Sequence, residues 1–432
     1  MLYRKFLEKL VYWKEHNVHT PLMLIGARQT GKTYILKYFC ENYFPNYIYI
    51  NFDEQKEYVN FFKKNLNPER IITDIETYIG KKIDIDNTII FFDEIQVSED
   101  VIASLKYFNE SNNNYKIVCA GSLLGVKINR FQSSFPVGKV YFEYLYPLDF
   151  EEFLISIGEK LLNKAIKESY LKMEALSEPL HEKAITLYKH YLCVGGMPAS
   201  ILEYLNKNKD LVLFDKNIQS NIITAYLADM AKYTERAEAV KTYEIYNSIP
   251  EQLTKENKKF VYKVVNPKAK NESYASSIDW LLQSGLLLKC IRIKRPEKPL
   301  KIYEEKNIFK IYLSDVGLLT NLSKFNYYDI IHDEGKEFRG ILSENYVAQV
   351  LKMKGYDLNY WTGSYTSEVD FILNIENAII PVEVKASSNT RSYSLTFYMK
   401  EYTPPYAIRL SLKNFGFTNN IKSIPLYAAH LL

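Results

Sequence analysis

The sequence contains few cysteines and no long apolar run. Its four cysteines, Cys40, Cys119, Cys193 and Cys290, lie far apart and form no Cys-x-x-Cys pair. This spacing supports neither a disulfide framework nor a zinc knuckle, and it is typical of a reducing compartment. No stretch reaches the ~20 apolar residues that a membrane-spanning helix needs, and the charged N-terminal segment predicts an amphipathic helix rather than a signal peptide. We therefore expect a cytoplasmic protein with no membrane partner.

Histidine is also scarce, and the net charge is small. The six histidines show no paired spacing, which argues against a histidine metal site. The formal charge of +4 is too small to indicate a nucleic-acid or membrane partner by itself. By contrast, the chain is 47% hydrophobic and 15% aromatic, which excludes a mainly disordered protein. At about 150 residues per domain, its length predicts roughly three domains.

The N-terminal third alternates short β-rich runs with helical stretches. Several of these runs are continuously apolar, as is typical of parallel strands that are covered on both faces. We therefore predict an α/β domain over residues 1–148. The runs are Leu22 to Ile25, Tyr47 to Phe52, Thr88 to Phe92, Lys116 to Ala120 and Val140 to Leu145.

The rest of the chain predicts four further parts. Residues 149–207 read as a helical lid that the segment VGGMP interrupts. Residues 208–322 read as helices followed by a β-hairpin, which is the order of a winged helix-turn-helix. Residues 323–340 are polar and predict a linker, and residues 341–432 predict a separate α/β module that opens with a helix.

A phosphate-binding loop follows the first apolar strand. Its residues match G-x-x-x-x-G-K-[ST] between that strand and a helical run. In such a loop the backbone N–H groups and the helix N-terminus bind phosphate oxygens. We expect Lys32 to contact the β and γ phosphates of ATP, and Thr33 to bind Mg²⁺. The predicted nucleotide-binding residues are Gly26, Ala27, Arg28, Gln29, Thr30, Gly31, Lys32 and Thr33.

Two carboxylates follow the strand Thr88 to Phe92. They fall at the carboxyl edge of the predicted sheet, where α/β proteins bind their ligands. Asp93 is the candidate Mg²⁺ ligand, and Glu94 is the candidate base that polarises the attacking water. Ser122 follows the next strand and is a candidate for sensing the γ-phosphate or positioning the water, although a turn or helix-cap role is the alternative.

A series of short motifs follows in order along the chain: GARQTGKT, YINFDE, FFDEIQ, AGS, FPVGKV, YPLDFEEF, VGGMP and YLSDVGLL. Their order resembles a large prokaryotic family of AAA-type (AAA+) P-loop ATPases. The resemblance covers roughly residues 1–400, and it implies an ATPase core, a helical lid, a winged helix and, in many members, a C-terminal restriction-endonuclease-like domain. Lys139 stands where the family often has arginine. Arg28, Arg130 and Arg236 are candidates for an arginine finger, which the sequence leaves unassigned, and rings are common among such modules, so self-association is a further expectation.

The positive charge is concentrated in one segment. Residues 255–310 carry 14 Lys or Arg and 6 Asp or Glu, a net charge of +8. The helical run 272–285 is the candidate recognition helix, with Ser273, Ser276 and Ser277 on its outer face. Such cations would lie beside a DNA phosphate backbone, whereas the alternative is a solvated hairpin or a protein-binding surface. The candidate DNA-binding residues are Lys268, Lys270, Arg292, Lys294, Arg295 and Lys298.

The last module resembles the PD-(D/E)XK nuclease pattern. Asp370 begins an apolar strand, and Glu383 and Lys385 lie on one face of the next strand. This arrangement predicts that Asp370 and Glu383 share a second divalent metal, Mg²⁺ or Mn²⁺, that Glu344 completes its shell, and that Lys385 orients the attacking water. The alternative is a salt bridge of Lys385 in a fold kept for DNA binding or packing.

These observations lead to one main hypothesis and one alternative. The main hypothesis is a DNA-associated Mg-ATPase whose nucleotide state controls the winged helix and a nuclease-like C-terminal region. The alternative is an ATP-gated signalling or toxin-like switch whose C-terminal region binds a protein partner and cuts no DNA.

Overall fold

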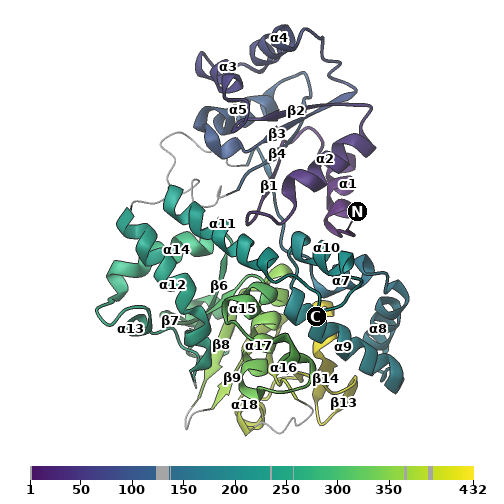
Figure 1. Ribbon diagram of the computed structural model, residues 1–432, viewed down its shortest axis with the longest axis vertical. Helices are drawn as coiled ribbons and strands as arrows, with labels where there is room; N and C mark the ends of the chain where they lie inside the picture. Colours follow the sequence, from purple (N-terminus) through teal and green to yellow (C-terminus); the bar gives the residue numbers. More distant parts are fainter. Residues whose placement is uncertain are drawn as a thin grey trace. The chain divides into compact units, whose positions relative to one another are not determined.

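The computed structural model divides the chain into two compact units. One unit spans Arg4–Tyr146, and the other contains Met1–Tyr3 and Pro147–Leu432. Figure 1 shows the helices and strands of both units. The structure describes residues 2–122, 136, 138–233, 236–255, 257–363, 367–387 and 393–432.

The first unit is built on a five-stranded parallel sheet. Its strand order is β2-β3-β4-β1-β5, so the first strand of the chain lies between the fourth and the fifth. The α/β prediction for this region and all five of its strands are confirmed, with bounds that shift by no more than one residue. The strands are β1 (Leu22–Ile25), β2 (Asn46–Asn51), β3 (Thr88–Asp93), β4 (Lys116–Ala120) and β5 (Tyr141–Tyr144).

Both faces of this sheet are covered, which explains why its strands are apolar without alternation. Neighbouring residues of β3 point to opposite sides: Phe91 packs with the cluster that contains Trp13, and Phe92 packs with the cluster that contains Phe108. Helices α1 and α2 supply the first cluster, whereas α3, α4 and α5 supply the second. Their bounds are α1 (Phe6–His16), α2 (Lys32–Tyr43), α3 (Asn60–Lys63), α4 (Pro68–Ile79) and α5 (Glu99–Glu110).

The second unit opens with helices, as the sequence predicts for residues 149–207. Gly195 and Gly196 separate two of them, and Gly195 adopts φ +75°. A Cβ atom at Gly196 would overlap the backbone oxygen of Leu148, so only glycine fits there. The helices of this part are α7 (Phe150–Ser156), α8 (Lys160–Lys172), α9 (Glu178–Val194) and α10 (Pro198–Asn206).

Asp315 joins two of the motifs that carry the family resemblance. Its Oδ2 accepts a hydrogen bond from the backbone N–H of Gly196 at 2.7 Å, and its Oδ1 accepts one from Leu318 at 3.0 Å. Asp315 therefore caps helix α15 (Val316–Leu322) and holds the VGGMP turn at the same time. Burial raises the pKa of Asp315 to about 6, although the backbone hydrogen bonds act to lower it.

The predicted winged region contains the expected helix and hairpin. The candidate recognition helix is α14, and strands β6 and β7 follow it as an antiparallel pair. The outer-face prediction for Ser277 is wrong, because this side chain is buried, whereas Ser273 and Ser276 are exposed. The elements are α11 (Asn217–Tyr233), α12 (Arg236–Thr254), α13 (Tyr262–Val265), α14 (Asn271–Gln283), β6 (Leu287–Ile293) and β7 (Glu304–Leu313).

The hairpin is not a free wing. Strand β6 also pairs in parallel with β8 (Asn359–Thr362), and β8 pairs with β9 (Glu368–Val369), so one four-stranded sheet joins the hairpin to the C-terminal region. The segment 323–340, predicted as a linker, instead contains α16 (Tyr327–Ile331) and the start of α17 (Lys336–Met353). The hairpin and the C-terminal residues therefore belong to one packed structure.

A third sheet completes the second unit. Its order is β10-β11-β12-β14-β13, with β11, β12 and β14 parallel to one another and the outer strands antiparallel. Helix α18 (Tyr393–Tyr402) packs on this region through Leu395 and Tyr398, both of which are buried. The strands are β10 (Phe371–Ile375), β11 (Ala378–Val384), β12 (Ala407–Ser411), β13 (Gly416–Thr418) and β14 (Ile421–Pro425).

Among the described residues, no helix is both long and apolar enough to cross a membrane. The four cysteines are buried and form no disulfide.

Candidate functional site

Backbone geometry shapes the loop between β1 and α2. Gly26 adopts φ +146°, and a Cβ atom there would overlap the backbone oxygen of Leu145. Gly31 adopts φ +93° and caps α2, which begins at Lys32. Both positions require glycine, because side chains rarely adopt these angles and the first has no room for one. Helix α2 begins directly after this loop, and the partial positive charge at the helix N-terminus favours phosphate there.

Lys32 is held against this loop. Its Nζ donates hydrogen bonds to the carbonyl oxygens of Gly26 at 3.0 Å and Ala27 at 2.7 Å. Burial lowers the pKa of Lys32 to about 8, although Glu94 and Asp93 act to raise it. A phosphate group beside this ammonium would favour its charged form, so the site is suited to an anionic ligand.

The remaining loop residues support the same turn. The Thr30 hydroxyl donates to the carbonyl of Ala27 at 2.9 Å, and Gln29 adopts φ +62°. The Arg28 Nε donates to the Ser122 hydroxyl at 3.2 Å, which ties the loop to the end of β4.

Asp93 and Thr33 form the part of the site that fits Mg²⁺. The Thr33 hydroxyl and the Tyr49 hydroxyl both hydrogen-bond to Asp93, and the Tyr49 bond measures 3.0 Å. Burial raises the pKa of Asp93, although these two hydrogen bonds act to lower it. A hydroxyl and a carboxylate in contact are oxygen ligands of the kind that Mg²⁺ takes in nucleotide sites. Asp93 and Thr33 would hold the ion, whose chemistry is to neutralise charge on the phosphates.

Glu94 is positioned by two polar neighbours. It adopts φ +53°, and its carboxylate accepts hydrogen bonds from the Gln96 amide and from the Ser122 hydroxyl, the latter at 3.4 Å. The Gln96 amide also lies 3.4 Å from the Ser122 hydroxyl. The structure thus brings Glu94 and Ser122 together, and it adds Gln96 and Tyr49 to the site. Gln96 lies in the motif FFDEIQ, which was the available signal for it.

Of the candidate arginine fingers, Arg130 lies outside the described residues, whereas Arg236 is exposed at the start of α12. Lys139 forms a surface ion pair with Glu110 at 3.1 Å.

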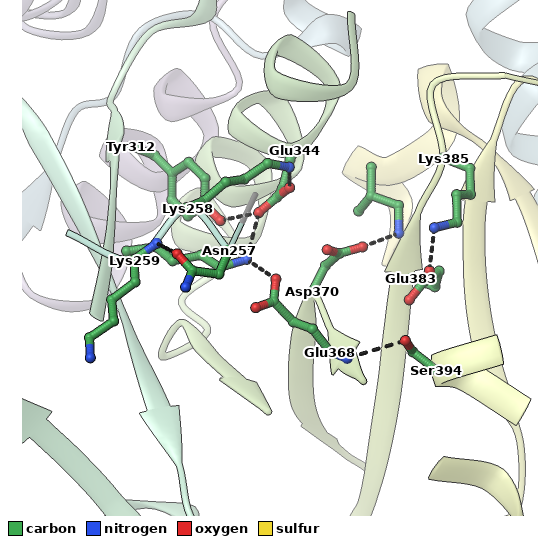
Figure 2. A network of polar contacts seen from close by, with 12 residues as sticks. Asn257, Lys258, Lys259, Tyr312, Glu344, Glu368, Asp370, Glu383, Lys385 and Ser394 are labelled. Atoms are coloured by element: carbon green, nitrogen blue, oxygen red, sulfur yellow. Dashed lines mark hydrogen bonds and ion pairs between the residues drawn. The ribbon is translucent and has the colours of Figure 1, made fainter. Parts of the chain in front are cut away.

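In the second unit, three predicted residues lie where β10 begins and its antiparallel neighbour β11 ends: Asp370, Glu383 and Lys385. The backbone N–H of Val384 donates to Asp370 Oδ2 at 2.7 Å, and Lys385 Nζ lies 2.6 Å from Glu383 Oε1 (Figure 2). Burial raises the pKa of Asp370 well above its usual value, and the carboxylates of Glu383 and Glu344 add to the rise. The raised pKa means that ionisation of Asp370 is disfavoured here, and a cation beside the carboxylates would favour it.

Glu344 is engaged elsewhere. Its carboxylate forms ion pairs with Lys310, at 3.0 Å, and with Lys258, and it accepts a hydrogen bond from the Tyr312 hydroxyl (Figure 2). Burial alone would raise the pKa of Glu344, but Lys258 and Lys310 outweigh it and hold the pKa well below its usual value. Its predicted role in completing a metal shell is therefore corrected: two ammonium groups already neutralise it. Among the described residues, no group of three His, Cys, Asp or Glu is arranged to hold a metal.

Lys310 is the centre of this network. Its side chain is 0% exposed, and its Nζ also lies 2.6 Å from Glu368 Oε1. Burial acts to lower the pKa of Lys310, but Glu344 and Glu368 outweigh it, so the pKa lies well above its usual value. Lys258, Lys310 and Glu368 are not among the site residues that the sequence predicts. A lysine inside the apolar run FKIYL was the signal for Lys310, because a charge there needs a buried partner.

The candidate DNA-binding residues are not equivalent. Arg292 is half-buried and its Nε lies 2.7 Å from Glu305, so much of its charge is neutralised within the hairpin. The other five are exposed: Lys268, Lys270, Lys294, Arg295 and Lys298.

Three family matches cover most of the chain. Residues 18–154 match the family described as "AAA domain". Residues 185–329 and 339–429 match two families described as domains of unknown function, DUF8612 and DUF4143. Together with the loop geometry, the first match assigns the N-terminal unit to the AAA-type P-loop ATPase domains, with ATP as the ligand of the site. No curated protein sequence matches the chain.

Solved structures show only distant similarity. A Walker-type ATPase of Pyrococcus abyssi is 15% identical, with a TM-score of 0.46 over 74% of this chain and 96% of that chain. The ORC2 protein of Aeropyrum pernix, solved as ADPNP–ADP complexes, is 12% identical, with a TM-score of 0.36 over 82% and 96%. Drosophila ORC bound to DNA is 14% identical, with a TM-score of 0.30 over 75% and 96%. TM-scores below 0.5 do not establish a shared overall fold.

Proposed function

We propose that this protein is a Mg²⁺-dependent ATPase that associates with DNA, and that its nucleotide state controls the C-terminal region. The observation that supports the ATPase part is that Lys32, Asp93, Glu94 and Ser122 follow three strands that end at one edge of the first sheet. Glu94 serves as the base that takes a proton from the attacking water, and Gln96 and Ser122 hold its carboxylate in place. Lys32 exchanges its two loop carbonyls for phosphate oxygens when ATP binds.

Phosphate release tests this assignment. The Lys32→Ala variant is expected to lose hydrolysis, whereas Lys81→Ala, an exposed lysine of the same unit, is expected to retain it. Hydrolysis by the Lys32→Ala protein at the parental rate would refute the assignment.

A second candidate activity is metal-dependent DNA cleavage in the C-terminal region. It is supported by the joint placement of Asp370, Glu383 and Lys385, whose chemistry fits a divalent metal held by two carboxylates beside a lysine that orients water. The neutralised Glu344 instead favours the alternative, a switch that binds a protein partner and cuts no DNA.

A nicking assay with Mg²⁺ or Mn²⁺ separates these two outputs. We expect Asp370→Asn to lose plasmid nicking and Glu376→Gln, an exposed carboxylate in the turn between β10 and β11, to keep it. Equal nicking by all three proteins would show contamination and leave the protein-binding switch as the better account.

A further inference from the structure

A groove lies between α18 and the strands β12, β13 and β14. It has a volume of about 880 Å³, and its walls are formed by described residues of the second unit alone. Arg409, Lys413 and Asn414 line it from β12 and the turn after it, and Tyr393 and Thr396 line it from α18. None of the lining residues is acidic, so the groove carries only positive formal charge.

Strand register places this groove on the same face of the sheet as Glu383. The Cα partner of Glu383 on β12 is Arg409, and the partner of Arg409 on β14 is Ser423. Register partners on neighbouring strands point to the same face and lie about 4.8 Å apart. Lys385 shares this face because it follows Glu383 by two residues. The floor of the groove therefore continues directly from the Asp370, Glu383 and Lys385 cluster.

Helix α18 borders both features. Ser394, in its first turn, accepts a hydrogen bond from the backbone N–H of Glu368 at 3.2 Å, next to the cluster (Figure 2). Tyr393, Thr396 and Met399 follow at spacings that place them along the side of α18 that faces the groove. One helix thus forms the edge of the cluster and the wall of the groove.

Arg409 has the properties of a ligand-binding side chain. Its Nε is buried, and no hydrogen-bond or ion-pair partner for this guanidinium exists among the described residues. A buried cationic donor without a partner is costly, and an anion in the groove would satisfy it. Lys413 is exposed at the end of the same groove and supplies a second cation.

We propose that this groove binds the phosphodiester backbone of a polynucleotide strand and leads it to the Asp370, Glu383 and Lys385 cluster. Arg409 and Lys413 contact successive phosphates, and the exposed ring of Tyr393 offers a stacking surface for a base. The proposal deepens the proposed DNA association and rests on it. It adds a binding surface separate from the exposed lysines of the hairpin.

The test measures salt-dependent binding of single-stranded and duplex oligonucleotides in EDTA, with Asp370→Asn as the background. Each lost phosphate contact should reduce the slope of log K against log salt by roughly 0.7 to 0.9, which weakens binding about fivefold to eightfold at about 0.1 M salt. We expect a reduction in slope of this size for Lys413→Ala. For the double variant with Arg409→Gln and Lys413→Ala we expect twice this reduction in slope. Lys400→Ala, on the exposed side of α18, is the matched control and should leave the slope unchanged.

The outcomes separate the groove from the proposed activity. An unchanged slope in Lys413→Ala and in the double variant would overturn the groove, even if Asp370→Asn abolishes nicking of plasmid by the otherwise parental protein. A reduced slope would support the groove even if no nicking is found. Competition by inorganic phosphate or a mononucleotide as strong, per phosphate, as that by an oligonucleotide would also overturn the proposal, since the groove would then be a site for a free phosphate.

Discussion

Replacement of Lys310 by methionine is expected to destabilise the second unit strongly. At an effective dielectric constant of about 20, an ion pair near 3 Å has a Coulomb energy of about 5 kcal/mol before desolvation. Lys310 forms two such pairs with a side chain that is 0% exposed. Removal of one member of a buried pair costs about 3 to 5 kcal/mol. Glu344 keeps Lys258, and the Glu368 side chain is 23% exposed, so we expect the lower end, about 3 kcal/mol.

This prediction can be measured by urea unfolding followed through tryptophan fluorescence. Trp13 lies in the first unit, whereas Trp280 and Trp361 lie in the second. A Trp13→Phe background therefore restricts the signal to the unit that contains Lys310. Lys306→Met, an exposed lysine of the same strand, is the matched control and should change the free energy of unfolding by less than about 0.5 kcal/mol.

The same measurement has a pH signature. Burial already raises the pKa of Glu368, and Lys310 acts to lower it, so without Lys310 the pKa of Glu368 should rise further above that of the unfolded chain. The folded variant then binds more protons, so its stability relative to the parent should improve as the pH falls from 8 to 5. The double variant with Glu368→Gln should recover part of the loss at pH 8. A cost below about 1 kcal/mol at pH 8, or one that does not vary with pH, would refute the role assigned to this network.

Four further predictions concern individual side chains. Burial raises the pKa of Asp315 to about 6, so its ionisation opposes folding. Between pH 5 and pH 7 the free energy of unfolding of the parent should therefore fall by roughly 1 kcal/mol relative to that of Asp315→Asn, as measured by unfolding at both pH values. A relative gain in the parent's stability would contradict this sign. Because the pKa of Lys32 is about 8, ATP binding above pH 8 should take up a proton, so a plot of log Kd against pH should rise with a slope approaching 1. Calorimetry in buffers of different ionisation enthalpy should detect that proton. Glu94→Gln should keep nucleotide affinity within about threefold but lower hydrolysis by roughly 100-fold, and loss of both would indicate a structural role. Arg292→Ala should change the salt dependence of DNA binding less than Lys294→Ala, because Glu305 already neutralises Arg292; equal changes would contradict that reasoning.

The sequence predicted the first sheet well because its signals are local. Each strand is a short apolar run, and the glycines of the phosphate loop sit where the backbone needs positive φ values. The placement of Asp93, Glu94 and Ser122 followed from the rule that parallel strands end at one edge. Tyr49 and Gln96 were harder to predict, because their contacts with Asp93 and Glu94 depend on side-chain direction rather than on strand order.

The second unit was harder to predict because its pairings join distant segments. The parallel pairing of β6 with β8 brings together residues that are distant in sequence, such as Arg292 and Tyr360. No local pattern encodes such a partner, so the sequence alone predicts a wing for the hairpin and a linker for the segment that follows. The buried Lys310 was a local sign of the error, since a lysine in a core strand requires carboxylates from elsewhere in the fold.

The network also changes the meaning of the charge count for residues 255–310. A net charge of +8 predicts a strongly basic surface only if its cations face solvent. Lys258 and Lys310 neutralise Glu344 and Glu368, and Arg292 is paired with Glu305, so three of the fourteen cations are engaged internally. Meanwhile Arg409 and Lys413 lie outside that segment, in a groove without carboxylates. The positive surface available to a polynucleotide is therefore divided between the hairpin and the third sheet. The affinity of the parent protein alone would not distinguish these two surfaces, whereas the slopes of log K against log salt for variants of each surface would.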